Sequence, residues 1–224
     1  TDIAKSMQVQ ALSRQEKVLE LTHDLSKDKV LKYLRQFPIE YLNHYQAEDI
    51  SWHARNILRF TNSEAPLILF SQKPNVGTEL MVYYKSNTPM VFGNIARTMA
   101  IKQLNVFSAQ VFITHNFRAL CTIMFQNKKG MPLDHDRLNN LRKAIIAGLD
   151  DHSQTLDISA STRQIFEIPT KISFLENMSK KQTNLEISTL DRQGLLAKIG
   201  ITLGSLDCLI RAARITTTGE RADD

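Results

Sequence analysis

Residues 91–111, VFGNIARTMAIKQLNVFSAQV, and residues 195–215, LLAKIGITLGSLDCLIRAARI, carry one apolar pattern twice, 104 positions apart. In each segment apolar residues first recur at helical spacing and then alternate, which predicts a helix followed by a β-strand. The coinciding apolar pairs are Val91 with Leu195, Phe92 with Leu196, Ile95 with Ile199, Met99 with Leu203, Ala109 with Ala213 and Val111 with Ile215. Agreement through two kinds of element without a gap predicts an internal repeat.

The sequence around the first segment predicts the rest of one repeat. The expected elements are strands at 67–70 and 79–84, a helix at 89–102, strands at 105–114 and 120–126, and a helix at 134–149. Pro89 is expected to open the first of these helices. The inward residues of the second are Leu138, Leu141, Ile145, Ile146 and Leu149. This order of elements predicts an α+β, ferredoxin-like fold, an antiparallel sheet with both helices on one face.

The pattern resumes after a polar stretch at residues 153–165, which we expect to be a linker. The expected elements of the second repeat are strands at 166–174 and 184–190, a helix at 194–206 and a strand at 209–218. We expect the second repeat to be truncated, without a fourth strand or a final helix. The edge of the strand at 209–218 would then carry unpaired backbone groups, and we expect a homodimer through residues 166–221.

Residues 1–60 are expected to be helical. The apolar faces expected are Leu12, Val18, Leu19 and Leu21 on one helix and Val30, Leu31, Leu34 and Phe37 on the next. Ser26 is expected to cap the second helix and Pro38 to end it, and a third helix is expected at 46–60. The predicted organisation is a helical segment at 1–60, a first domain at 64–152, a linker at 153–165 and an incomplete second domain at 166–224.

The composition is that of an ordinary globular protein and excludes several classes. The chain has 224 residues, of which 42% are hydrophobic and 23% charged. No apolar run approaches the roughly 18 residues of a membrane span, and the polar N-terminus does not resemble a signal peptide. The net charge of +5 resides in residues 61–150, where the basic residues are scattered. We therefore expect no nucleic-acid or membrane partner.

Motifs of catalysis are sparse. Cys121 and Cys208 stand far apart in apolar contexts, which favours two reduced core thiols and a cytoplasmic location. The pair His23-Asp24 is typical of metal-dependent phosphohydrolases, but no further ligands lie close to it in the sequence. Asp134 begins a predicted helix and is interpreted as its cap. We assign no catalytic residue, metal ligand or cofactor to this chain.

The segment Leu190 to Leu196 is the best candidate for a ligand site. A strand ends, Asp191 follows, and Gly194 opens a helix, so the free N–H groups of the first helical turn could hold a carboxylate. Asp191 could receive the amino group of the same ligand, which would then be a free amino acid. In the alternative interpretation Asp191 is only the helix cap and Leu195 and Leu196 are core residues.

The motif Asp191-Arg192-Gln193-Gly194-Leu195-Leu196 resembles the ligand loop of the ACT domain, a small regulatory module that binds amino acids. Residues 212–221, AARITTTGER, resemble more specifically the last domain of the bacterial PII uridylyltransferase/uridylyl-removing enzymes. Supporting matches are Trp52-His53-Ala54-Arg55, Gly77-Thr78-Glu79, Ala109-Gln110-Val111-Phe112, Pro132-Leu133-Asp134 and residues 169–175, PTKISFL. The resemblance covers about residues 40–221.

The resemblance implies a parent enzyme with nucleotidyltransferase, HD phosphohydrolase and two ACT domains, of which this chain is the C-terminal part. That parent adds UMP to the PII protein and removes it, uses Mg²⁺ or Mn²⁺, and responds to glutamine. No position here matches the parent's catalytic motifs, so the chain itself is expected to be inactive. The resemblance assigns amino-acid binding to Asp191, Arg192, Gln193, Gly194, Leu195 and Leu196. The first-repeat equivalents are Asn87, Thr88, Pro89, Met90, Val91 and Phe92, where Asn replaces the acid and Met replaces the glycine.

Two other functions stay open. The chain could be an ACT-type regulatory module of another amino-acid-controlled enzyme. The helical residues 1–60 could also be a remnant of an HD phosphohydrolase.

Overall fold

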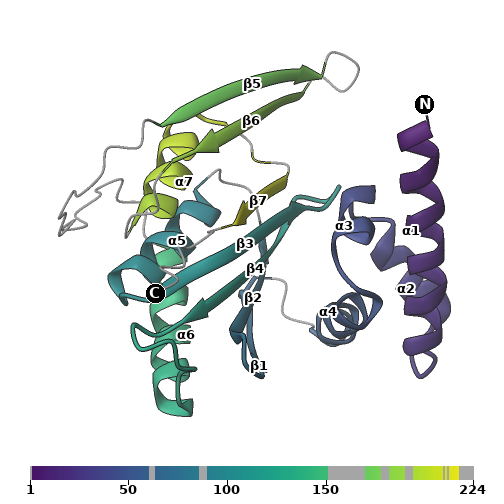
Figure 1. The fold of residues 1–224 in the computed structure, drawn as a ribbon. Helices are drawn as coiled ribbons and strands as arrows, with labels where there is room; N and C mark the ends of the chain where they lie inside the picture. Colours follow the sequence, from purple (N-terminus) through teal and green to yellow (C-terminus); the bar gives the residue numbers. More distant parts are fainter. Residues whose placement is uncertain are drawn as a thin grey trace, which may run out of the picture.

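The structure is a computed structural model of the whole chain. It describes residues 2–60, 64–85, 90–150, 170–177, 182–189, 194–208, 210 and 212–216. Figure 1 shows a central antiparallel sheet between two groups of helices, with the N-terminal helices on one side. The expected α+β class is therefore confirmed, and the boundaries expected for the individual domains stay predictions.

Four strands of the first repeat form the sheet that the sequence predicts. They are β1 (Leu67–Lys73), β2 (Gly77–Lys85), β3 (Asn105–Ile113) and β4 (Arg118–Gln126), and they lie in the order β1-β2-β4-β3 with antiparallel neighbours. The turn before β2 needs Gly77, because its φ is +147° and an added Cβ would lie 2.7 Å from the Phe125 carbonyl oxygen. The two central strands, β2 and β4, are therefore held at the short spacing of a regular sheet.

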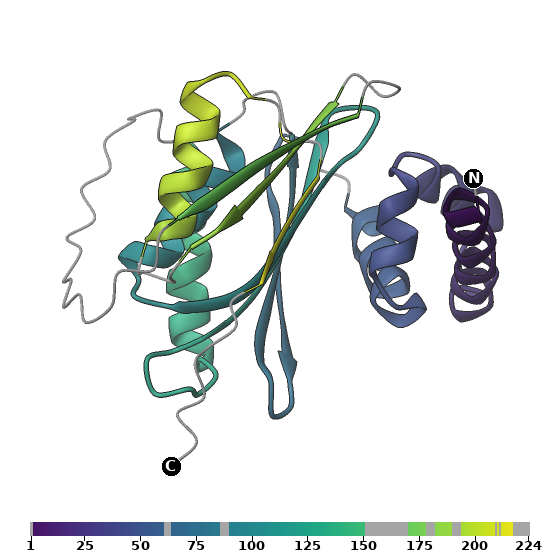
Figure 2. The ribbon, with the colours of Figure 1, turned by 45° about the horizontal axis from the view of Figure 1, so that its top comes forward.

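Helices α5 (Val91–Ile101) and α6 (His135–Leu149) cover one face of this sheet, as expected (Figure 2). Their apolar sides pack with Leu80, Val82, Ile123 and other inward strand residues into one buried core. Asp134 caps α6 by accepting a hydrogen bond from the Arg137 amide at 2.9 Å, which confirms its interpretation as a cap. One inward residue was assigned wrongly, because Ile146 is 40% exposed at the edge of the helix contact.

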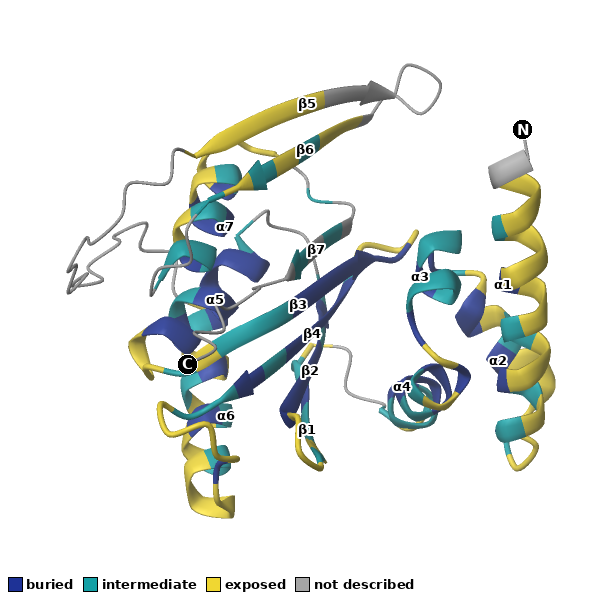
Figure 3. Ribbon diagram, in the orientation of Figure 1, coloured by how far each residue is buried: buried dark blue, intermediate teal, exposed yellow. Residues whose placement is uncertain are grey.

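Four N-terminal helices cover the other face. They are α1 (Asp2–Leu21), α2 (Lys27–Leu34), α3 (Ile39–His44) and α4 (Ala47–Arg59). Aromatic residues of this helical cover, such as Tyr41 and Tyr45, pack on Met81, Phe112 and Leu120 of the sheet. The sheet of the first repeat thus packs apolar side chains on both of its faces. Much of β2, β3 and β4 is accordingly buried (Figure 3).

The sequence interpretation of these helices needs three corrections. Pro38 does not end the second helix, which stops at Leu34; it is instead the N-cap residue of α3, a helix the periodicity did not predict. Ser26 occupies the N-cap position of α2, but its side chain makes no capping hydrogen bond. Leu12 is 54% exposed, whereas Val18 on the same helix is fully buried.

The described part of the second repeat contains β5 (Lys171–Asn177), β6 (Gln182–Ser188), α7 (Leu195–Ser205) and β7 (Ala212–Thr216). β5 and β6 form a separate two-stranded sheet, whereas β7 joins the first sheet beside β3 and makes it five-stranded. One edge of the strand expected at 209–218 is therefore paired within the chain. Residues 153–165, 166–169 and 217–224 lie outside the described residues.

The two repeats meet about a local twofold axis. The register places Gln110 opposite Arg214, its own counterpart 104 positions later, and Ala109 opposite Ile215, the counterpart of Val111. Equivalent residues that exchange places across an antiparallel pair define twofold symmetry. The internal repeat expected from the sequence thus becomes an arrangement in which each repeat presents the same surface to the other.

The helices of the two repeats obey the same symmetry. A Cβ on Gly93 would lie 2.8 Å from the Ile201 nitrogen, and a Cβ on Gly200 would lie 2.8 Å from the Gly93 Cα. Ala96, Ala100 and Ala197 form a small buried cluster at the same contact. Because small residues line this contact, the backbones of α5 and α7 approach closely. The contact between the repeats therefore extends from the pairing of β3 with β7 into the helix layer.

Candidate functional site

The loop predicted to bind an amino acid is described only in part. Asp191, Arg192 and Gln193 lie outside the described residues, and so do Asn87, Thr88 and Pro89 of the first repeat. Gly194 is the N-cap residue of α7 with φ +81° and ψ −1°, a left-handed conformation that favours glycine. Leu196 is half-buried and packs against the core, while Leu195 is also half-buried.

The residues that follow these two loops, Met90 and Gly194, differ in their side chains. Met90, the counterpart of Gly194, packs against α7, because a Cβ on Gly204 would lie 2.4 Å from the Met90 sulfur. By symmetry Gly194 is expected to face Ala100, the counterpart of Gly204. Gly194 has no side chain to fill that place, whereas Met90 fills the corresponding one. Val91 and Phe92 are buried in the core of the first repeat, at 7% and 5% exposed.

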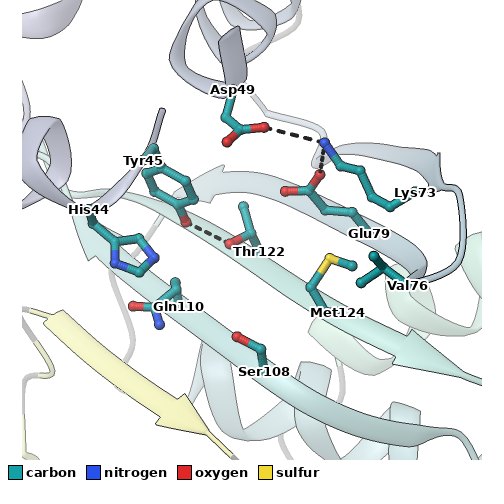
Figure 4. Close-up of a pocket in the computed structure, with 10 residues that line it drawn as sticks. All are labelled: His44, Tyr45, Asp49, Lys73, Val76, Glu79, Ser108, Gln110, Thr122 and Met124. Atoms are coloured by element: carbon teal, nitrogen blue, oxygen red, sulfur yellow. Dashed lines mark hydrogen bonds and ion pairs between the residues drawn. The ribbon is translucent and has the colours of Figure 1, made fainter. Parts of the chain in front are cut away.

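A second candidate site lies on the opposite face of the sheet, where the helical cover ends. It is a pocket of about 340 Å³, lined by His44, Tyr45, Asp49, Lys73, Val76, Glu79, Ser108, Gln110, Thr122 and Met124 (Figure 4). The lining side chains come from α3, α4 and the loops beside them, and from the sheet strands. Sequence reasoning missed this site, because its residues are dispersed and each has an ordinary neighbourhood along the chain.

One end of the pocket holds three charged groups. The Lys73 ammonium lies 3.3 Å from Asp49 Oδ1 and 3.0 Å from Glu79 Oε2, so one cation serves two carboxylates. Burial raises the pKa of Glu79, and the Lys73 ion pair only partly offsets that effect. Partial burial alone would lower the pKa of Lys73, but Glu79 and Asp49 together raise it. This end therefore carries an excess of negative charge when both carboxylates are ionised.

The polar groups in the middle of the pocket hydrogen-bond each other, whereas the amide at its far end has no hydrogen bond from the described residues. The Tyr45 hydroxyl hydrogen-bonds the Thr122 hydroxyl at 2.6 Å and so links the helical cover to the sheet. Gln110 is only 5% exposed, yet no hydrogen bond reaches its side-chain amide from any described residue. In Figure 4 Gln110 lies beneath His44, and Ser108 lies further along the same strand.

The remaining sequence candidates have structural roles. Asp24 pairs with Arg55, and the hydrogen bond from that guanidinium lowers the pKa of Asp24; this pair fastens the turn after α1 to α4. His23 contacts the Glu20 carbonyl through Nδ1. Cys121 is buried, which raises the pKa of its thiol to about 12, but Cys208 is exposed and is not the core residue that was expected.

The described residues lack both a metal cluster and a membrane-spanning helix. They contain no group of three or more His, Cys, Asp or Glu side chains that could hold a metal ion. The Mg²⁺ or Mn²⁺ that the resemblance implies therefore has no ligand set among them, and no catalytic step is assigned to a metal here. Within the same part of the chain, no helix has both the length and the hydropathy that crossing a bilayer requires.

The antiparallel sheet with helices packed on one face defines an α+β domain of the ferredoxin-like class. The chain is similar to proteins named bifunctional uridylyltransferase/uridylyl-removing enzyme. It is 33% identical over 193 residues to that of Vibrio campbellii, 34% over 194 residues to that of Vibrio vulnificus strain YJ016, and 29% over 211 residues to that of Idiomarina loihiensis. These matches confirm the family resemblance: the chain is a homologue of part of these enzymes.

The matches cover 85–91% of this chain but only 22–24% of each relative's length. The chain therefore corresponds to less than a quarter of those enzymes. No family model matches the sequence, and no solved structure matches the fold significantly.

Proposed function

We propose that this chain is a regulatory, amino-acid-sensing part of a PII uridylyltransferase/uridylyl-removing enzyme, with glutamine as the amino acid. The observation that carries the proposal is the twofold pairing of the repeats in a homologue of part of these enzymes. That pairing sets the first turn of α7 beside the other repeat, with a glycine where the first repeat has Met90.

Chemistry at this loop suits an α-amino acid. The N–H groups of the first turn of α7 can donate to a carboxylate, and the positive end of the helix dipole favours that charge. Asp191 supplies the opposite charge for an ammonium group. Asn87 at the equivalent place would leave the ammonium without a counter-charge, so we assign binding to the second repeat and not to the first.

The wider role rests on the family. We propose that the whole enzyme transfers a uridylyl group to PII and removes it with Mg²⁺ or Mn²⁺ in its other domains, that it acts in the cytoplasm, and that two copies associate through residues 166–221. This chain would then bind glutamine without catalysing either reaction. Incorporation of UMP into PII by the purified chain would contradict this division of labour.

Calorimetry with L-glutamine tests the binding site. The unaltered chain should bind one glutamine, and Asp191→Asn, which copies the first-repeat residue, should weaken binding about tenfold or more because an ion pair is lost. The matched variant Asn87→Asp should leave the affinity unchanged. Equal effects of the two variants, or two glutamines bound per chain, would contradict the assignment to the second repeat.

A further inference from the structure

The pocket beneath the helical cover is lined by two buried polar side chains whose hydrogen-bonding capacity is not fully used. Glu79 is 6% exposed, and its Oε2 atom has no hydrogen-bond donor of acceptable geometry, although the Lys73 ammonium lies 3.0 Å away as an ion pair. Gln110, equally buried, has an amide without a hydrogen bond from the described residues. A buried polar atom without a hydrogen bond costs about 1–3 kcal/mol, so a ligand that donates to Glu79 Oε2 would be stabilised.

The register of the sheet sets the distance between the two ends of the pocket. Glu79 pairs with Met124, which in turn pairs with Ser108, so Glu79 and Ser108 stand two strand spacings apart, about 10 Å. Gln110 lies one row further along, opposite Thr122. The Val76 and Met124 side chains line the interval between the ends and supply an apolar wall.

The charges at the Glu79 end of the pocket favour a cationic group on the ligand. Asp49 and Glu79 share the single Lys73 ammonium, and the side chains of Asp49 and Lys73 are 31% and 36% exposed, so this end is open to solvent. A second cation placed there would complete the pairing of two carboxylates with two positive charges. A protonated amine does so with a donor for Glu79 Oε2.

The Gln110 end of the pocket favours a neutral polar group on the ligand. The Gln110 amide offers both a donor and an acceptor, and the Ser108 hydroxyl lies on the same strand beside it. Because the Tyr45 and Thr122 hydroxyls already bond each other, they do not compete for the ligand. A carboxamide matches the donor and the acceptor of the Gln110 amide in one group.

We propose that this pocket is a small-molecule binding site for a compact aliphatic amine that carries a carboxamide at its other end. The ammonium binds beside the Asp49 and Glu79 carboxylates that Lys73 already bridges, the methylene chain lies on Val76 and Met124, and the carboxamide pairs with Gln110. The site is separate from Gly194 at the start of α7, a helix that packs against α5 on the opposite face of the sheet.

Three related probes test this on the unaltered chain. 5-Aminopentanamide has both polar ends on a four-carbon spacer, pentanamide lacks the amine, and pentylamine lacks the amide. By isothermal titration calorimetry the first should bind with a Kd of about 1 mM, as its size allows, and each of the others about tenfold more weakly. Equal binding of all three, or no saturable binding of any, would overturn the proposal.

Variants then locate the site. Gln110→Leu should weaken 5-aminopentanamide binding about tenfold, and Asp49→Asn should weaken it while leaving pentanamide unaffected. Asn105→Leu replaces an exposed amide on the same strand and should change nothing. Asp191→Asn should also have no effect, so failure here is distinguishable from failure of glutamine sensing at the loop. Equal affinities of Gln110→Leu and Asn105→Leu would contradict the proposed pocket.

Discussion

The two repeats share a sequence pattern but not a structural environment. The first repeat is a four-stranded sheet with α5 and α6 on one face and the helical cover on the other. The described strands of the second divide between a two-stranded sheet, whose Ile172 and Phe174 are 56% and 66% exposed, and the edge of the first repeat's sheet. A repeated pattern thus specifies the same local elements, whereas the partners available to each element decide which sheet it joins.

The residues at the starts of α5 and α7 also differ between the repeats. Met90 fills the space against Gly204, and Val91 and Phe92 belong to the core. Gly194 has no side chain at the corresponding position. The start of α5 is therefore closed by packing, and we expect the amino acid proposed above to bind at the start of α7.

The largest effect is expected from Gly93→Val, which would separate the repeats. Its branched side chain would collide with the backbone of Gly200 and Ile201, where even a Cβ has no room. We expect a loss of about 3 kcal/mol in the free energy of unfolding of the second repeat. Hydrogen exchange should accelerate in α7 and β7, while β2 and β4 stay protected.

Gly204→Ala is the matched control, because its Cβ would clash only with the flexible Met90 side chain and would lie at an ordinary contact distance of 3.4 Å from the Met90 Cα. Its effect should be clearly smaller. Unchanged exchange in α7 and β7 of Gly93→Val would show that the contact between α5 and α7 does not hold the repeats together.

The next effect concerns the helical cover that packs on the sheet of the first repeat. His53 is fully buried, its Nδ1 lies 2.9 Å from the Tyr41 hydroxyl, and burial lowers its pKa to about 3. Because the unfolded chain takes up this proton near pH 6.5, stability should fall as the pH drops from 6.5 towards 3. The loss should reach about 2–3 kcal/mol at pH 4.5.

Urea unfolding at a series of pH values measures this. His53→Gln should flatten the profile between pH 6.5 and 4.5, and His135→Gln, at an exposed site, should leave it unchanged. A wild-type profile without a decline in this window would contradict a neutral, buried His53.

A smaller effect is expected where the cover meets the sheet. Tyr45→Phe removes the 2.6 Å hydrogen bond to Thr122 and should cost about 1 kcal/mol, measured by urea unfolding at pH 7. Tyr84→Phe, on the opposite face of the sheet, is the control and should be nearly neutral, since no described residue hydrogen-bonds its hydroxyl. Equal costs would mean that the bond between cover and sheet adds nothing.

The smallest effect should come from the exposed apolar face of β5. Phe174→Ser should change the free energy of unfolding by less than about 0.5 kcal/mol, as surface substitutions usually do. Phe125→Ala, at a fully buried position of the first repeat, should cost about 3–5 kcal/mol. A large effect of Phe174→Ser would mean that this face is covered in solution, as in the homodimer proposed above.

Much of the fold could be predicted because its elements have strong local patterns. Helices α4, α5, α6 and α7 and the strands of the first repeat lie within a few residues of their expected positions. α3 was missed because six residues are too few to show periodicity, and Pro38 was interpreted as an end although proline equally suits a start.

The membership of β7 in the first sheet could not be predicted, because pairing between distant strands depends on register and packing that no local pattern records. The pocket was missed for the same reason. Asp49, Lys73, Glu79 and Gln110 come from four separate elements, and only the fold brings them together. The loop at residues 191–196 could be proposed from the sequence because its motif is contiguous, and its role as a ligand site stays a prediction.

The most direct test of the account is the footprint of glutamine on the chain, measured by amide hydrogen exchange with and without saturating L-glutamine. The account predicts slower exchange at the first turn of α7, from Leu195 onwards, and at the facing end of α5 near Ala100. It predicts no change around Val91 and Phe92. Protection at residues 90–92 instead of 195–197, or no protection anywhere at saturating glutamine, would contradict the proposal that the second repeat senses the amino acid.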